Sequence, residues 1–486
     1  MDKNVRIAII GGGPAGLAAG RYLEQKGYQN YTIFERTGHV GGKCHSPSYH
    51  GKRYEMGAIR GVPNYYAIQD IRDWTGVKPD GPVLFRNYKY PDGRRDYRWN
   101  TEEARKSPFK YFLKHPKDAL HRNKLQKQIR KFGKILETKY KGYDVTGHIG
   151  VAQGKYQGYA ATPGREPMSG ENPNLKDLYR PFDQFCKRNG CPLVTEVWVQ
   201  PFTSFGYGFF DEIPAGYVLK YLDFKTRRNF VKINLWTWKD GTQSIYEALN
   251  AKLRHPAVLN SDITKVVRGD KVTITVNGKE EVFDKLIITC PLQVATEKNP
   301  LNNPTTISLD KWLDVTDEER ALFSKIDYER YDTQAMTIEK GKYPDVSYYI
   351  VDNMVPERMG HVMVYYRRWV NEPDRPIVTY ILRHHKTYNG GKELDYEATL
   401  PLAYQDRKDF DCPPEMVDGK PNVIYKFQPY YFPHVYSEDY KDGWYDKVEA
   451  RQGKNNTYYG GEIMSFGDRD ETCEYSRDLV SRFFAD

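Results

Sequence analysis

The sequence lacks the patterns that stabilise a secreted protein or anchor a membrane-spanning one. Its six cysteines have no paired C-x-x-C spacing, which argues against a zinc site and against a disulfide framework. The N-terminus has neither the h-region nor the cleavage site of a signal peptide, and no apolar stretch is long enough to cross a bilayer. There is no internal repeat and no charged low-complexity tail. We therefore expect a cytoplasmic protein with reduced thiols and no bound metal.

The chain also lacks a strong charge imbalance. Its 486 residues carry a formal net charge of +9, which permits attraction to acidic ligands or anionic lipids but does not indicate a nucleic-acid partner. Aromatic residues are abundant, with 40 tyrosines and 21 phenylalanines. The length is sufficient for about two or three domains with substantial cores. No motif indicates the oligomeric state.

The most informative pattern occupies the first sixty residues. A short apolar, β-branched segment at 5–10 is followed at once by glycines and then by a helical segment from about 15 to 26. Gly11, Gly13 and Gly16 therefore stand between a strand and a helix, as in a dinucleotide-binding fingerprint. A second strand ends at Glu35, whose carboxylate can accept a hydrogen bond from a ribose hydroxyl. Together these features predict a dinucleotide site, with a purely structural βαβ unit as the alternative.

The segment after the second strand extends this pattern with a Gly-Gly-Lys run at 41–43 and a Tyr-Glu-Met-Gly-Ala run at 54–58. This extension resembles the FAD-binding amine-oxidase superfamily and implies FAD rather than NAD; an ordinary glycine loop is the alternative. Strands at 262–268 and 286–291, and a strand running into glycines and an acid at 457–462, are similar to the segments that complete the superfamily's FAD domain. The cofactor residues implied are Gly11, Gly13, Pro14, Ala15, Gly16, Glu35, Arg36, Gly42, Lys43, Gly57, Ala58, Ile59, Ile263, Gly461 and Glu462.

The predicted fold is α/β, with a Rossmann-type FAD-binding domain built from discontinuous segments, an α+β substrate domain and a helical cap. We assign residues 1–75, 234–296 and 440–486 to the FAD-binding domain. Residues 76–97, 192–233 and 297–439 are assigned to the substrate domain, and residues 98–191 to the cap or insertion.

Longer runs carry a more specific resemblance. The segments 41–47, 217–224 and 461–467 strongly resemble the bacterial polyenoic fatty acid isomerases, and the resemblance covers most of the chain. That family moves a double bond of a polyunsaturated fatty acid to give a conjugated acid, using FAD without net redox change. A hydride leaves the carbon between two double bonds for flavin N5 and returns to another carbon, because the cation left behind is delocalised. The region 98–180 departs from the family by being longer and more basic.

Three substrate residues follow from the resemblance. Arg86 matches the arginine that binds the substrate carboxylate, and a guanidinium fork suits that group. Phe205 and Phe230 match aromatic residues near the reacting carbons, where a ring face can attract developing positive charge. For an arginine in a strand the alternative is a solvated side chain, and for the two phenylalanines it is plain channel lining.

Region 105–141 is the most basic part of the chain. Leu125, Ile129, Phe132 and Leu136 share one face of a predicted helix whose other positions are rich in lysine and arginine. One interpretation is peripheral contact with an anionic membrane; the other is a helix packed on its own domain with a solvated basic face. For the whole protein, the alternatives to an isomerase are a flavin oxidase or fatty-acyl desaturase with net redox turnover, and a lipid-binding protein without turnover.

Overall fold

The computed structural model describes residues 1–82, 86–90, 92–94, 96–143, 148–157, 169–232, 234–303, 305–342, 347–370, 372 and 376–485. The side chains of residues 86, 157, 224 and 231 are outside this description. Among the helices described, none combines the length and the apolar character needed to span a membrane.

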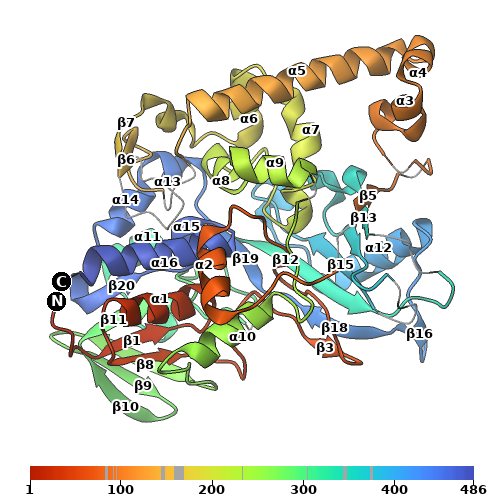
Figure 1. The fold of residues 1–486 in the computed structure, drawn as a ribbon. Coiled ribbons are helices and arrows are strands. Elements are labelled where there is room, and N and C mark those ends of the chain that lie inside the picture. Colours follow the sequence, from red (N-terminus) through yellow and green to blue (C-terminus); the bar gives the residue numbers. More distant parts are fainter. Residues whose placement is uncertain are drawn as a thin grey trace.

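A four-stranded parallel sheet forms one end of the molecule (Figure 1). Its order is β2-β1-β11-β20, and its strands are β1 (Ile7–Ile10), β2 (Tyr31–Phe34), β11 (Lys285–Ile288) and β20 (Thr457–Tyr459). All three pairings are parallel, and the strands come from the beginning, middle and end of the chain. The expected Rossmann-type domain with discontinuous segments is therefore confirmed.

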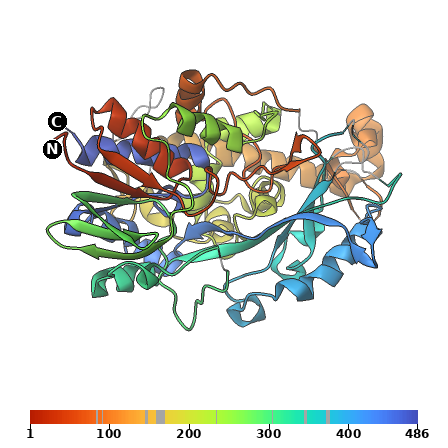
Figure 2. The same ribbon diagram turned by 90° about the horizontal axis from the view of Figure 1, so that it is seen from below.

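Helices cover this sheet, and a small antiparallel sheet adjoins it. The helices are α1 (Pro14–Gln25), α2 (Tyr66–Thr75), α10 (Gln243–Lys252) and α16 (Arg469–Phe483). α1 packs along α16 over the parallel strands, which brings the first and last parts of the chain together (Figures 1 and 2). The antiparallel sheet comprises β8 (Ile263–Arg268), β9 (Val272–Val276) and β10 (Lys279–Phe283). Asn277 and Gly278, both at positive φ, form the turn between β9 and β10.

A larger mixed sheet lies beside the parallel one (Figure 2). Its order is β18-β12-β15-β14-β13-β5, with β19 also paired to β12. The strands are β5 (Arg86–Tyr88), β12 (Asp327–Met336), β13 (Ser347–Tyr349), β14 (Val362–Tyr366), β15 (Ile377–Leu382), β18 (Val423–Phe427) and β19 (Tyr430–His434). Every residue of β12, β14 and β15 is buried, because the main core lies on one face and a second core, under α12 (Tyr396–Asp409), lies on the other.

The remaining elements are short pairs of strands and short helices. The strands are β3 (Ser48–Tyr49), β4 (Lys52–Arg53), β6 (Lys155–Gln157), β7 (Ser169–Glu171), β16 (Met416–Val417) and β17 (Lys420–Pro421). The helices are α11 (Asp317–Phe323), α13 (Ser437–Lys441), α14 (Trp444–Glu449) and α15 (Glu462–Ser465).

A helical layer roofs the space between the two sheets (Figure 1). It contains α3 (Glu102–Lys106), α4 (Pro108–Lys114), α5 (Pro116–Thr138), α6 (Phe182–Arg188), α7 (Thr195–Trp198), α8 (Ala215–Tyr221) and α9 (Phe224–Lys232). The helix predicted to carry Leu125 and Leu136 lies within α5, and the basic region 105–141 also contains α4 and the end of α3. The end formed by α3, α4 and the start of α5 projects from the body of the molecule.

The apolar face predicted within region 105–141 points into the protein. Leu125 and Phe132 are fully or almost fully buried, and Phe132 makes edge contacts with Phe182 at 5.9 Å and Trp198 at 5.6 Å. This packing agrees with the interpretation of a helix packed on its own domain. Because the protein itself covers this face, contact with a lipid surface would require other residues.

Candidate functional site

A cavity of about 620 Å³ lies where the parallel sheet, the mixed sheet and the helical roof meet. Most of the residues predicted to bind the cofactor line it. They are Gly11, Gly13, Pro14, Ala15, Glu35, Arg36, Gly42, Lys43, Gly57, Ala58, Ile59, Ile263 and Glu462. Phe205 and Phe230 line the same cavity. The structure therefore brings together most of the predicted cofactor residues and two of the three predicted substrate residues.

The glycines shape the turn between β1 and α1. Gly11 has a φ of +114°, which a side chain would strain. A Cβ at Gly16 would lie 1.9 Å from the Gly11 carbonyl oxygen, so Gly16 permits the close packing of helix and turn. A Cβ at Gly13 would meet only Gly42, at 3.8 Å, so this backbone faces open space in front of α1. Gly16 itself is behind the cavity wall, whereas Gly13 lines the cavity.

The Glu35 carboxylate is held at the edge of the cavity, at the end of β2. One oxygen accepts a hydrogen bond from the Gly12 N–H at 2.8 Å, and the other accepts from the N–H and the hydroxyl of Thr37, each at 2.8 Å. Each carboxylate oxygen has more than one lone pair, so this anchoring leaves capacity for a ligand hydroxyl.

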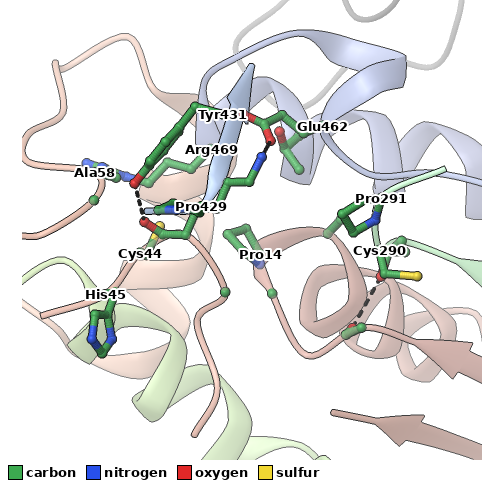
Figure 3. A pocket seen from close by; sticks show the side chains of 18 of the residues that line it. Pro14, Cys44, His45, Ala58, Cys290, Pro291, Pro429, Tyr431, Glu462 and Arg469 are labelled. Atoms are coloured by element: carbon green, nitrogen blue, oxygen red, sulfur yellow. Dashed lines mark hydrogen bonds and ion pairs between the residues drawn. The ribbon is translucent and has the colours of Figure 1, made fainter. Parts of the chain in front are cut away.

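Lys43 and Glu462 form an ion pair with each other, 419 positions apart in the chain. The Tyr431 hydroxyl donates to the Lys43 carbonyl oxygen at 3.3 Å. Figure 3 shows Tyr431 and Glu462 close to each other on one side of the cavity. The sequence pattern predicted both charged residues as cofactor contacts but not their pairing, because nothing in the local pattern links such distant positions.

A buried ion pair that the sequence pattern did not reveal fixes the segment before Gly57. The Arg368 Nη1 donates to the Glu55 carboxylate at 2.8 Å, and both side chains are fully buried. The same carboxylate accepts from the Thr242 N–H at 3.0 Å. These bonds tie the cavity wall to the loop after α9 and to the loop after β14. A Glu in a run that otherwise reads as loop was the only local signal.

Tyrosine and phenylalanine side chains form the apolar part of the cavity. Tyr207 stacks on Phe432 with ring centroids 3.7 Å apart and contacts Tyr221 at 4.3 Å. Burial raises the pKa of Tyr221 to about 12, with the charge of Arg60 opposing that rise. Tyr221 is therefore neutral around pH 7. The sequence pattern singled out none of these three residues as site residues.

Arg60 is a cavity residue that the sequence pattern missed. Its guanidinium carbon lies 4.3 Å from the ring centroid of Phe205 and 4.7 Å from that of Phe230. The two phenylalanines predicted to attract positive charge thus already contact a cation. Arg86 lies in β5, as a strand position predicts, but its side chain is outside the described part of the structure.

The family of flavin containing amine oxidoreductases matches residues 14–388. The chain belongs to this family. The crystal structure of a CLA-producing fatty acid isomerase from P. acnes is 46% identical in sequence, with a TM-score of 0.83 and complete coverage of both chains. A wild-type putrescine oxidase structure, at 13% identity, 99% coverage of each chain and a TM-score of 0.63, shares the fold.

Among curated proteins, a polyenoic fatty acid isomerase from Ptilota filicina is 35% identical over 76 residues. That segment is 16% of this chain and 15% of the relative. Polyamine oxidase 7 of Oryza sativa subsp. japonica is 40% identical over 59 residues, 12% of each chain. The chain thus spans only a small part of these curated relatives.

FAD is the cofactor of this chain, and the cavity fits it. The open backbone at Gly13, in front of the first turn of α1, leaves room and N–H groups for a pyrophosphate. The anchored Glu35 carboxylate stands at the end of the next strand, where a ribose hydroxyl would donate. Gly461, in contrast, is not part of the lining; with a φ of +84° and no space for a Cβ, it turns the chain so that Glu462 reaches the cavity.

Proposed function

We propose that the protein is an FAD-dependent isomerase that shifts a double bond of a polyunsaturated fatty acid to give a conjugated fatty acid. The observation that carries this proposal is the full-length similarity, at 46% identity, to a structure described as a CLA-producing fatty acid isomerase. The aromatic cavity beside the dinucleotide fingerprint supports it, because a hydrocarbon chain requires apolar walls. Bound FAD supplies hydride acceptance and hydride return, so the reaction needs no external oxidant.

The chain's own residues hold the substrate and exclude water. Tyr207, Tyr221 and Phe432 provide a packed wall along which an acyl chain can lie. We propose that Phe205 and Phe230 face the reacting carbons and stabilise positive charge there. The proposed role of Arg86 is to bind the substrate carboxylate.

The decisive test is anaerobic. The holoenzyme is mixed with linoleic acid while conjugated-diene absorbance and the flavin spectrum are followed together. An isomerase accumulates diene and ends with oxidised flavin. A flavin that bleaches and stays bleached until oxygen is admitted would instead indicate an oxidase or desaturase. No diene and no bleaching with any polyunsaturated acid would indicate a lipid-binding protein.

We also propose that a cytoplasmic pool of this protein contacts anionic membranes through the projecting end of the helical roof. Three large apolar side chains are exposed there, Phe109 by 83%, Leu113 by 73% and Leu120 by 71%. The exposed lysines around them are Lys106, Lys110, Lys114 and Lys117. Apolar side chains ringed by lysines match an anionic lipid surface, from which fatty acids are released.

A further inference from the structure

Two buried carboxyl groups lie behind the aromatic wall of the cavity. Glu212, in the loop before α8, is 6% exposed, and Glu329, in β12, is 1% exposed. The Oε2 of Glu212 accepts a hydrogen bond from the Lys386 N–H at 2.7 Å, and its Oε1 accepts from the backbone N–H of residue 209 at 3.4 Å. The Oε2 of Glu329 is buried and has no hydrogen-bond partner among the described residues. Neither glutamate lines the cavity or has a part in the proposed reaction.

Both carboxyl groups adjoin the same stretch of backbone. A Cβ at Gly208 would lie 2.4 Å from the Oε1 of Glu329, and Glu212 binds the N–H of the next residue. Two carboxyl groups this close in a dry interior cannot both ionise without strong repulsion. Burial, followed by the charge of Glu212, raises the pKa of Glu329 well above its usual range, and burial raises the pKa of Glu212 to about 7.

His385 lies beside Glu212 but does not neutralise it. Its Nε2 is 3.1 Å from the Asp211 carboxylate and 3.7 Å from that of Glu212. Burial lowers the pKa of His385, but the Asp211 hydrogen bond and the charge of Glu212 outweigh burial and raise it. The Nδ1, however, accepts the Tyr388 N–H at 2.9 Å, so only Nε2 carries a proton and the ring is neutral in this arrangement.

The cation beside Glu329 is already paired. Arg330 forms an ion pair with Asp327, whose carboxylate also accepts from the Tyr436 hydroxyl at 2.8 Å. The charge of Arg330 opposes the rise in the pKa of Glu329 but does not outweigh burial. The remaining ionisable groups that interact with this cluster are Glu357, His384, Lys386, Glu393, His434 and Glu438.

The backbone beside the two carboxyl groups carries Tyr207, which lines the cavity. Its neighbours Gly206 and Gly208 have φ of +83° and +91°, and neither has space for a Cβ. At Gly206 that atom would lie 2.4 Å from the ring of Tyr331. The segment is therefore held between an aromatic ring and the carboxyl group of Glu329. An ionised Glu329 could gain solvent on this side only if the segment moved away.

We propose that Glu212 and Glu329 are positioning residues for the aromatic wall, and that they hold Tyr207 in place only while the pair keeps a proton. The ring of Tyr207 stacks on Phe432, and its hydroxyl donates to the Gly467 carbonyl oxygen at 2.8 Å. When both carboxyl groups ionise, their repulsion and hydration displace the segment and loosen this wall. Because burial raises both pKa values, the loss falls on the alkaline side, above about pH 7. The inference rests on the proposed function only for its ligand, an acyl chain.

The test measures binding without turnover. The holoenzyme is titrated at pH 6 and pH 9 with methyl stearate, which has no ionisable group, and the flavin absorbance change gives each Kd. We expect the Kd of wild type to rise roughly tenfold between these values, as the loss of one apolar contact implies. Near-ultraviolet circular dichroism of the ligand-free holoenzyme should change over the same range.

Two variants remove the second ionisable carboxyl group. Glu329→Gln replaces it with a neutral group of the same shape, so the Kd at pH 9 should stay at its pH 6 value. Glu212→Gln should behave alike, because Glu329 alone in a buried position keeps its proton. The matched control is Asp478→Asn. Burial raises the pKa of Asp478 to about 8, so it titrates in the same range, but it does not line the cavity and its variant should keep the wild-type pH dependence.

A wild-type Kd and dichroism that do not change between pH 6 and pH 9 would overturn the proposal, and so would Glu329→Gln with the pH dependence of wild type. If Glu329→Gln does not fold, Glu212→Gln decides by the same criterion. Diene formation tests the isomerase separately. Diene formation with a flat wild-type profile would refute the pair and keep the reaction. A pH-dependent dichroism that Glu329→Gln abolishes, without diene formation, would keep the pair and refute the reaction.

Discussion

Burial holds several cavity side chains in their neutral forms. The ring centroid of His45 lies 4.9 Å from that of His39, on which it stacks, and 4.8 Å from that of Phe427. Burial, together with nearby positive charge, lowers the pKa of His45 to about 4. Burial raises the pKa of Cys44 to about 12. These two neutral side chains lie in a cavity that charged residues, among them Glu35, Lys43 and Glu462, also line.

The His45 shift predicts acid sensitivity. The unfolded chain takes up a proton near pH 6.5 and the folded chain only near pH 4, so stability present above pH 6.5 is lost as the pH falls through that window. The loss from this residue is at most about 3 kcal/mol. His45→Phe should weaken the fall in melting temperature between pH 6.5 and pH 4.5, whereas His255→Gln, a change at an exposed histidine, should not. An unchanged pH dependence in His45→Phe would contradict the assignment.

The contribution of the aromatic ring of Phe205 can be tested separately from the contribution of its apolar volume. Phe205→Leu keeps an apolar side chain but removes the π face, so we expect kcat for linoleic acid to fall about tenfold, equivalent to about 1.4 kcal/mol, with little change in the Kd for methyl stearate. Phe209→Leu is the matched control, because Phe209 is a buried phenylalanine that does not line the cavity. If Phe205→Leu retains the wild-type kcat, the residue is only channel lining.

At the scale of elements, the helical roof divides into a packed part and a free end. The C-terminal half of α5 is covered through Phe132 and its aromatic neighbours, while α4 and the start of α5 expose apolar side chains. Apolar residues at helical spacing in the sequence predict the packed half of α5, but they do not predict the exposed apolar end. Phe109 and Leu113 share a face of a helix only seven residues long, and Leu120 belongs to the next helix.

That free end predicts vesicle binding. Inserted apolar side chains contribute roughly 1.5–3 kcal/mol each, so replacing Phe109, Leu113 and Leu120 together by Ser should abolish most co-sedimentation with phosphatidylglycerol vesicles. The control changes Met416 and Val417, exposed by 56% and 49% in β16, to Ser and should bind as wild type does. Added salt should weaken binding through the lysines. Failure of the intact protein to co-sediment at low salt would refute the membrane contact.

At the scale of the whole molecule, the sequence alone predicts those site residues that lie close together in the chain. The glycines and Glu35 could be placed because strand, turn and helix follow one another in a recognisable order, and Ile263 because its segment resembles the superfamily. The Lys43–Glu462 and Glu55–Arg368 pairs could not, since each joins residues hundreds of positions apart. Arg60 was missed for the same reason. Arg60 is recognisable as a site residue only by its contacts with Phe205 and Phe230, and these contacts form only when the chain folds.

The cofactor site joins the beginning, middle and end of the chain, and this predicts that FAD stabilises the whole fold. Ligand at one hundred times its Kd contributes about 2.7 kcal/mol, so removing FAD should lower the melting temperature and adding it back should restore it. Gly13→Val should have the melting temperature of the FAD-free protein, and added FAD should not raise it, because the valine side chain would fill the open space in front of α1. The control is Gly269→Val, at a position where the added Cβ has no neighbour within 4 Å and which does not line the cavity; it should respond to FAD as wild type does. Retention of FAD by Gly13→Val would mean that the pyrophosphate does not lie against this backbone, and the cofactor would have to enter the cavity in another orientation.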